Sequence, residues 1–304
     1  MTTLTDLSRD LEELVAKTSP SVVAVEHHGS QGSGVIVADD GYVVTNAHVA
    51  RCTKNELRVR LASGEELRAR LVGEDAATDL AVLRLEANAL PSLALAEDRR
   101  LRVGQLVVAI GNPLRFERSV TLGIVSALER TLPGAAQATA LLEGLVQTDA
   151  AINPGSSGGP LLDASGAVVG ITTAIIPFAR GMGFAIPAHT VSWVAAVLMR
   201  SGRIARPVLG IHARGEELRP VLATGTGQSR ALRVHAVSAR SAAAEAGLAE
   251  GDLVLSANGR PIFGVHDLQR EMVLTEGAAL SLEVLRGQER RAISARPSAS
   301  PRAA

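Results

Sequence analysis

The chain has 304 residues, more than a single compact core usually fills, so two domains are the first expectation. Its 31 acidic residues balance its 31 Lys and Arg residues, which argues against an electrostatic hold on nucleic acid or on an anionic membrane. Aromatic residues make up only 2% of the chain, so little surface is available for stacking bases or sugars. The expected partner is therefore neutral or peptide-like.

The first twenty residues predict an amphipathic helix that ends at Pro20. Its apolar residues recur at three- and four-residue spacing and are Leu4, Leu7, Leu11, Leu14 and Val15. Charged residues interrupt this stretch, so no signal peptide is predicted, and no later segment has the length of a membrane span. We expect the helix to dock on its own domain or on a neighbouring subunit. As written, the protein would stay in the cytoplasm, or work in the periplasm if an export signal was removed.

Residues 21 to about 186 contain many short β-rich runs separated by Gly, Asp, Asn and Pro. Such a succession indicates a barrel or a sandwich rather than alternating βαβ units. The period then changes, and residues 188–202 suit a helix that ends near Gly202. Residues 201–208 follow as a linker, and residues 209–296 form a second unit of strands and short helices. Residues 297–304 have the composition of a disordered tail.

Polar residues at three places in the first unit indicate a function only when they are considered together. His48 closes a β-rich run, Asp79 opens another, and Ser156 and Ser157 stand side by side in the string DAAINPGSSGGPLL. Alone, each has an ordinary structural explanation as a packed histidine, a turn aspartate or a tight glycine-rich corner. A catalytic hydroxyl, however, needs a base to take its proton and a carboxylate to orient that base. The order His, Asp, Ser is the one expected for a triad at the mouths of two successive barrels.

Several stretches together resemble the HtrA (Deg) family of trypsin-like serine proteases over essentially the whole chain: GSGVIV, TNAHV, TDLAVL, SVTLGIVSAL, QTDAAINPGSSGGPLL and MGFAIP. The resemblance implies a mainly β fold, with a trypsin-like double six-stranded β-barrel over residues 21–200 and a small α+β PDZ domain over residues 209–296. It also implies that Ser157, directly before GGPL, is the nucleophile, that His48 is the general base and that Asp79 orients it. No cofactor is implied, and the other histidines show no metal-ligand grouping.

The same resemblance assigns the oxyanion hole to the loop formed by Gly155, Ser156 and Ser157, where backbone N–H groups would bind the developing negative charge. The family usually has Asn where this chain has Ser156, and because the donors are backbone groups we expect the difference to matter little. Family members commonly rest with this loop distorted. The resemblance therefore leaves open whether activity needs a trigger.

Specificity is expected to come from Ala151 and Ile152, close before the nucleophile. Trypsin-type enzymes hold a carboxylate six residues before the nucleophile, and Ala151 occupies that position here. A small apolar pocket floor favours cleavage after small or branched aliphatic residues. Because such residues are buried in folded proteins, the expected substrates are unfolded or misfolded polypeptides.

In the second unit, the stretch PVLGI resembles the carboxylate-binding loop of a PDZ domain. The resemblance implies that this loop grips the terminal carboxylate of a peptide that adds to the sheet as a strand, through Val208, Leu209, Gly210 and Ile211. Two functional classes are open: an ATP-independent serine endopeptidase for protein quality control, and a non-proteolytic PDZ peptide-binding chaperone or scaffold. The family forms trimers, and because this chain has no aromatic residue before Tyr42, we hypothesise that a homotrimer forms through the Leu-rich N-terminal helix.

Overall fold

The computed structural model describes residues 3–27, 30–51, 57–96, 101–112, 119–133, 141–175 and 181–299. The chain divides into two compact units, Met1–Ile204 and Ala205–Ala304, and the division falls inside the linker predicted at residues 201–208. Within the described part of the chain, none of the helices has the length and apolar character needed to cross a bilayer.

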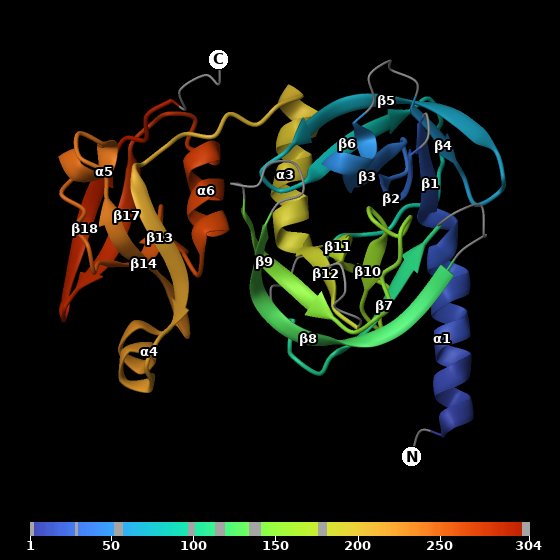
Figure 1. The fold of residues 1–304 in the computed structure, drawn as a ribbon, viewed down its shortest axis with the longest axis horizontal. Helices are drawn as coiled ribbons and strands as arrows, with labels where there is room; N and C mark the ends of the chain where they lie inside the picture. The colour runs from blue at the N-terminus through green and yellow to red at the C-terminus, as the bar shows by residue number, and fades with distance from the viewer. Residues whose placement is uncertain are drawn as a thin grey trace. The chain divides into compact units, whose positions relative to one another are not determined.

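The first unit contains two closed six-stranded antiparallel barrels, as predicted (Figure 1). In the first barrel the strand order is β1-β2-β3-β6-β5-β4, and the strands are β1 (Val22–His27), β2 (Ser30–Ala38), β3 (Tyr42–Asn46), β4 (Leu57–Arg60), β5 (Glu66–Asp75) and β6 (Leu80–Leu85). In the second barrel the order is β10-β11-β12-β9-β8-β7, and the strands are β7 (Leu106–Gly111), β8 (Ser119–Pro133), β9 (Leu141–Thr148), β10 (Pro160–Leu162), β11 (Val168–Ile175) and β12 (Gly183–Pro187).

Both barrel cores are built from aliphatic side chains, as the scarcity of aromatic residues requires. The first core includes Val23, Val25, Ile36, Val43, Val59, Leu83 and Leu85. The second includes Val107, Val125, Val146, Leu161 and Val169. Burying each such side chain contributes about 1.5–3 kcal/mol to the free energy of unfolding. Because the strands close around this core, the ends of the loops between them are held in place.

Four short helical segments complete the first unit: α1 (Leu4–Thr18), η1 (Ser19–Ser21), α2 (Ala47–Ala50) and α3 (Ala188–Ser201). Helix α1 starts at a capping box, in which Thr3 and Asp6 exchange side-chain and backbone hydrogen bonds. Helix α3 contacts β5 and β6 of one barrel and β11 and β12 of the other, and it ends at Gly202, whose φ is 69°. The helix predicted at residues 188–202 is therefore present.

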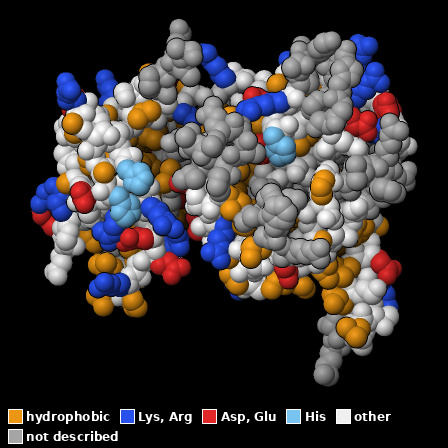
Figure 2. Space-filling view, in the orientation of Figure 1, with side chains coloured by type: hydrophobic (Ala, Val, Ile, Leu, Met, Phe, Trp, Pro, Cys, Tyr) orange, Lys and Arg blue, Asp and Glu red, His pale blue; other side chains and the backbone are white. Residues whose placement is uncertain are grey.

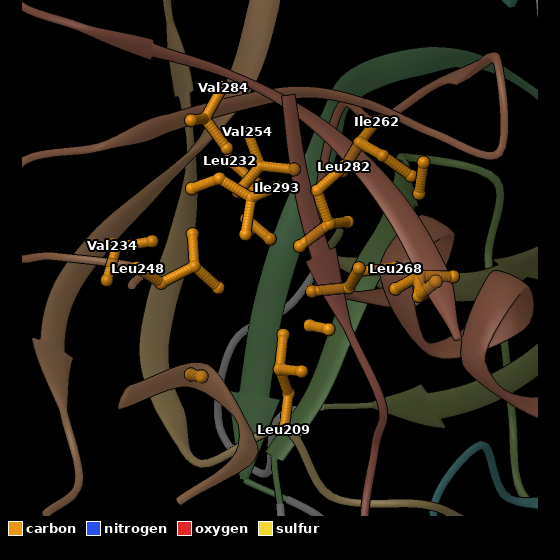
Figure 3. Packing of buried hydrophobic residues seen from close by; sticks show 14 of the residues in the cluster. Leu209, Leu232, Val234, Leu248, Val254, Ile262, Leu268, Leu282, Val284 and Ile293 are labelled. Atoms are coloured by element: carbon orange, nitrogen blue, oxygen red, sulfur yellow. The ribbon is translucent and has the colours of Figure 1, made fainter. Parts of the chain in front are cut away.

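The second unit is a sheet whose strands follow the order β13-β14-β15-β17-β18, with β16 paired to β15. Its elements are β13 (Ile211–Glu217), α4 (Pro220–Thr226), β14 (Arg230–Val237), α5 (Ala242–Glu245), β15 (Leu253–Ala257), β16 (Arg260–Pro261), α6 (Val265–Leu274), β17 (Leu280–Arg286) and β18 (Glu289–Ala295). Figure 3 shows the core of this unit, in which Leu209 points toward the same cluster as Leu268 and Leu282.

The tail predicted to be disordered from residue 297 is ordered at its start. Ser298 and Val208 donate their N–H groups to each other's carbonyl oxygens, at 2.9 and 2.8 Å. The prediction was wrong for residues 297–299 because composition does not show that this segment has a backbone partner far away in the sequence. The rest of the predicted tail, residues 300–304, lies outside the described residues.

A buried ion pair stabilises the second unit. Asp252 is fully buried, and both of its carboxylate oxygens accept hydrogen bonds from Arg286, at 2.7 and 2.8 Å. Burial raises the pKa of Asp252, but hydrogen bonds from Arg286 and from the Ala249 N–H, together with the positive charge of Arg286, lower the pKa further than burial raises it. The pKa therefore lies below its ordinary value, so the pair stabilises the folded state at neutral pH.

We expect Arg286→Met to lower the stability of the second unit by about 3 kcal/mol, because it leaves a buried carboxylate without its partner. The exposed pair Arg290–Glu283 supplies the control, and Arg290→Met should change stability by less than about 1 kcal/mol. Hydrogen exchange of strands β15 and β17 measures both effects. Since the folded-state pKa of Asp252 is depressed, the stabilisation is present above the unfolded pKa of about 4 and is lost as the pH falls below it. Equal exchange in the two variants at pH 7 would contradict this account.

Candidate active site

The fold brings the three predicted catalytic side chains to one place, and Thr173 of β11 joins them. His48 lies in α2, Asp79 in the turn before β6, and Ser157 in the loop before β10. The Thr173 hydroxyl donates to Asp79 Oδ2 at 2.7 Å, while the Thr173 carbonyl accepts a hydrogen bond from Ser157 Oγ at 2.9 Å. One residue of the second barrel therefore contacts both the carboxylate of the first barrel and the serine of its own.

Asp79 is held in a single orientation by bonds to both its backbone and its carboxylate. Its carbonyl oxygen accepts hydrogen bonds from the Ala47 N–H and from Asn46 Nδ2, and its Oδ1 accepts from the His48 N–H at 3.0 Å. The residue adopts a left-handed conformation with φ of 55°, which Asp tolerates better than most residues. Only 12% of its side chain is exposed, so the carboxylate faces the histidine rather than water.

The contact between His48 Nδ1 and Asp79 Oδ2, 2.7 Å long, determines which ring nitrogen is free. An ionised carboxylate only accepts hydrogen bonds, so Nδ1 carries the proton and Nε2 of the neutral ring is left as an acceptor. The His48 side chain is 37% exposed, which leaves this nitrogen accessible from the surface. A base with its free nitrogen directed away from the carboxylate is what proton removal from a hydroxyl requires.

The loop that carries Ser157 is fastened to the first barrel by Ser33 of β2. The Ser33 hydroxyl donates to the Gly155 carbonyl at 2.7 Å, and the Ser33 N–H donates to the Ser157 carbonyl at 2.8 Å. Ser33 is fully buried, and its own carbonyl accepts a hydrogen bond from the Thr45 hydroxyl at 2.6 Å. The position of Ser157 is thus set by both barrels.

The two glycines that follow the serines are required by close approach. A Cβ on Gly158, whose φ is 90°, would collide with the Ser33 carbonyl oxygen and the Thr45 hydroxyl. A Cβ on Gly159 would collide with the Ile110 carbonyl oxygen. Glycine is therefore the residue that lets the serine loop lie directly against β2 and β7.

Within the described part of the chain, two backbone N–H groups of this loop have no backbone acceptor. The Ser156 carbonyl accepts a hydrogen bond from the Thr172 hydroxyl at 2.7 Å, which turns the Ser157 N–H of the same peptide plane in the opposite direction. Among the described residues, neither this N–H nor that of Gly155 has a backbone acceptor. Gly155 has φ of 93°, a conformation that glycine adopts without strain.

Beside the serine loop, residues 149–152 are attached to β8. The Asp149 carboxylate accepts a hydrogen bond from the Ile124 N–H at 2.7 Å, and the Thr121 hydroxyl donates to the Ala151 carbonyl at 3.0 Å. Ala151 is exposed, whereas Ile152 is only 8% exposed and lies under Gly183, where an added Cβ would be 2.5 Å from Ile152 Cδ1. An apolar side chain therefore fills the space that Gly183 leaves open.

In the second unit, the stretch Val208–Ile211 has all of its inner carbonyl groups occupied. The carbonyls of Val208, Leu209 and Gly210 accept hydrogen bonds from the N–H groups of Ser298, Ala243 and Ser238, at 2.9, 2.9 and 2.8 Å. Each peptide plane points its N–H opposite to its carbonyl, so the next three N–H groups are directed away from these partners. Such a row of N–H groups suits a carboxylate.

Sequence analysis missed the polar side chains that hold the catalytic residues in place. Thr173, Ser33, Thr45 and Thr172 are all buried or half-buried and all donate hydrogen bonds within the site. The strings GSGVIV and TNAHV, which contain Ser33 and Thr45, carried a signal because both contributed to the family resemblance. Among the described residues, no group of three or more His, Cys, Asp or Glu side chains is placed to hold a metal ion.

Comparison with known proteins agrees with this geometry. Residues 32–171 match the trypsin-like peptidase domain, and residues 233–286 match the PDZ domain. HhoB of Synechocystis sp., named as a serine protease, is 39% identical over 279 residues, which cover 89% of this chain and 67% of that protein. This chain belongs to the HtrA (Deg) family. The predicted family, its double-barrel fold with a PDZ domain and its serine endopeptidase class are thereby confirmed.

This chain spans only part of the length of some of its curated relatives. A periplasmic DegP-like serine endoprotease of Pseudomonas putida is 40% identical over 280 residues, but this chain spans only 56% of its length. Among solved structures, the HtrA-type protease AlgW with a tripeptide has a TM-score of 0.73 at 34% identity, covering 95% of this chain and 97% of that one. The serine endoprotease from Yersinia pestis has a TM-score of 0.65 at 32% identity, covering 95% and 98%.

We expect Thr173→Val to lower kcat for peptide hydrolysis by about tenfold to a hundredfold with little change in KM, because Asp79 loses a donor to its charged carboxylate. Thr173→Ser keeps a hydroxyl at the same position and should retain most of the activity. Steady-state kinetics on a fluorogenic peptide measure both variants. If the valine and serine variants were equally active, the hydroxyl would have no role in orienting the triad.

Proposed function

We propose that this chain is an ATP-independent serine endopeptidase that degrades unfolded or misfolded proteins, with residues 21–200 as the protease domain and residues 209–296 as the PDZ domain. The observation that carries the proposal is the hydrogen-bonded network of His48, Asp79, Thr173 and Ser157, which places a base, its orienting carboxylate and a hydroxyl around one point. A site that served only as a scaffold would not need this combination of residue types.

In the proposed reaction, Ser157 Oγ attacks the carbonyl carbon of the scissile peptide bond while His48 Nε2 takes its proton. Asp79 stabilises the imidazolium that forms. The leaving amine then receives the proton from His48, and a water molecule, activated by the same base, hydrolyses the acyl-enzyme. Because the Ser157 hydroxyl donates to the Thr173 carbonyl in the present structure, the side chain must turn about its χ1 toward His48 before the attack.

The oxyanion hole is assigned to Gly155, Ser156 and Ser157, with the N–H groups of the first and third as donors. Their lack of a backbone acceptor in the described part of the chain supports this role. Removing one such donor typically costs about 3 kcal/mol in transition-state stabilisation, so the conformation of the loop matters as much as the triad. The Ser33 hydrogen bond to the Gly155 carbonyl supports that conformation.

The specificity pocket is assigned to Ala151 and Ile152. Ile152 fills the space under Gly183, and neither Ala151 nor Ile152 provides a charge to attract a basic side chain. We therefore propose cleavage after Ala, Val or Ile. Such residues become accessible when a protein unfolds, so the pocket itself selects unfolded chains.

Peptide capture by the PDZ domain is assigned to Val208, Leu209, Gly210 and Ile211. The N–H groups of Leu209, Gly210 and Ile211 point away from the partners of the preceding carbonyls, which supports the binding of a terminal carboxylate. The AlgW structures similar to this chain are titled as complexes with a decapeptide and with a tripeptide. In this chain we propose that captured C-termini either tether the substrate or order the active-site loops.

The experiment that tests the proposed function is digestion of β-casein by the wild-type chain, Ser157→Ala and Ser156→Ala, with and without a peptide that has a hydrophobic C-terminal residue. We expect Ser157→Ala to abolish cleavage and Ser156→Ala to retain it, because only the former removes the nucleophile. Mass spectrometry of the products should place the cuts after Ala, Val or Ile.

Absence of cleavage by the wild-type chain, even with peptide, would shift the assignment to the alternative, a non-proteolytic PDZ chaperone or scaffold. Loss of activity in Ser156→Ala but not in Ser157→Ala would show that Ser156, and not Ser157, is the nucleophile. Cuts after Lys and Arg would contradict the pocket assignment.

We further propose that the chain works as a homotrimer assembled through α1. The support is the exposure of its apolar face, with Leu4 at 87% and Leu7 at 37%. For the compartment, the sequence-based alternatives are the cytoplasm as written and the periplasm if an export signal was removed. The description of DegP-like relatives as periplasmic favours the second.

We expect Leu4→Asp/Leu7→Asp to lower the molar mass in light scattering from three chains to one, because the substitutions charge the apolar face of α1. Arg9→Asp, on an exposed position of the same helix, is the control and should keep the trimer mass. A monomer mass for the wild-type chain would exclude the proposed assembly.

A further inference from the structure

The edge strand of the PDZ sheet carries His212 and Arg214 in its first half, where a captured peptide would lie. Strand β13 pairs with β14 and is the terminal strand in the sheet order. If the terminal carboxylate sits at Val208–Ile211, as proposed above, the peptide runs antiparallel to β13, toward Glu217. Its side chains then alternate between the groove and the outer face of the sheet.

The residues of β13 show the same alternation. Ile211 and Ala213 pack against the core of the unit, whereas His212 and Arg214 are exposed on the outer face. With the last peptide side chain in the groove, the penultimate and fourth-from-last side chains lie on the outer face, beside His212 and Arg214. We call these two peptide positions the outer positions.

Strand β14 adds a second histidine to this face. His212 is opposite Ala236 and Ala213 is opposite Val234, so His235 is the extra residue of a β-bulge. The bulge brings the His235 ring to 6.1 Å from the His212 ring, centroid to centroid. Figure 2 shows two adjacent histidine side chains on the second unit with cationic side chains beside them.

The balance of charges on this face favours an anion. Arg214 lies directly opposite Arg233, and like charges at such a position destabilise a sheet. Glu216 accepts a hydrogen bond from Arg233 at 2.6 Å, while Arg214 forms no ion pair within the described residues. Helix α4 packs on the same face without a charged residue of its own, and Arg219, directly before α4, lies beside Glu216 and Arg233. The charge of Arg214 is therefore available to a ligand.

We propose that His212, Arg214 and His235 form an acid-selecting surface that favours C-terminal peptides with Glu or Asp side chains at the outer positions, and that this selection strengthens as the pH falls toward 5.5. Histidine is the residue type whose charge changes between pH 5 and 8. Glu and Asp side chains of a peptide stay largely ionised at pH 5.5. Substrate selection by the PDZ domain then depends on the acidity of its surroundings. The inference rests on the peptide capture proposed above.

The test uses the full chain carrying Ser157→Ala, so that the peptides are bound but not cut. Two fluorescent decapeptides with the same hydrophobic last residue carry Glu or Gln at both outer positions, and anisotropy measures their Kd at pH 7.5 and 5.5. A third peptide is the Glu peptide with an amidated C-terminus. We expect the Glu peptide to bind about threefold to tenfold more tightly than the Gln peptide at pH 7.5, and the ratio to increase at pH 5.5.

Variants assign the effect to the proposed surface. Arg214→Gln should reduce the preference for Glu at both pH values, and His212→Gln/His235→Gln should remove its pH dependence. Arg260 is an exposed arginine on β16, and Arg260→Gln is the charge-matched control. This variant should keep both the preference for Glu and its pH dependence. Equal Kd values for the Glu and Gln peptides would overturn this inference and leave peptide capture intact. Failure of every peptide to bind, or equal binding of the amidated peptide, would overturn capture as well.

Discussion

The active site depends on one contact between the barrels, the pair of hydrogen bonds that Ser33 makes to the loop of Ser157. The two halves of the catalytic machinery come from different barrels, since His48 and Asp79 belong to the first and Ser157 to the second. Each barrel closes on its own aliphatic core, and nothing in either closure fixes the distance between them. The buried Ser33 side chain supplies that restraint directly at the nucleophile, and the absence of a side chain at Gly158 makes the approach possible.

Thr173, a residue of the second barrel, adds a second link between the barrels. Its side chain reaches the carboxylate of the first barrel, and its carbonyl contacts the hydroxyl of the second. The arrangement links the orientation of Asp79 to the resting position of Ser157. A displacement of β11 would therefore change both, so regulation of the site can act through a strand rather than through either catalytic residue.

The sequence was sufficient to predict the fold and the family. Alternation of apolar residues indicated strands from residue 21 onward, and the motifs around His48, Asp79 and Ser157 indicated the triad and the family. It was not sufficient for the supporting residues, because Thr45, Thr172 and Thr173 sit in β-rich runs where threonine is common for its branched side chain alone. Their roles depend on contacts between strands far apart in the chain. The same limit explains the error for the segment that begins at residue 297. There Ser298 pairs with Val208, 90 residues earlier in the sequence, in place of the expected disorder.

The pairing of Val208 with Ser298 has a consequence for how the second unit is defined. A boundary drawn at residue 296 would remove Ser298, whose N–H donates to the Val208 carbonyl. The Leu209 N–H, which lies in the same peptide plane and is the first donor of the proposed carboxylate loop, would then lose its fixed orientation. The proposed peptide site is therefore supported, on the side away from the peptide, by Ser298 near the end of the described chain. A fragment of this domain prepared for binding studies needs Ser298 to present the loop as the intact chain does.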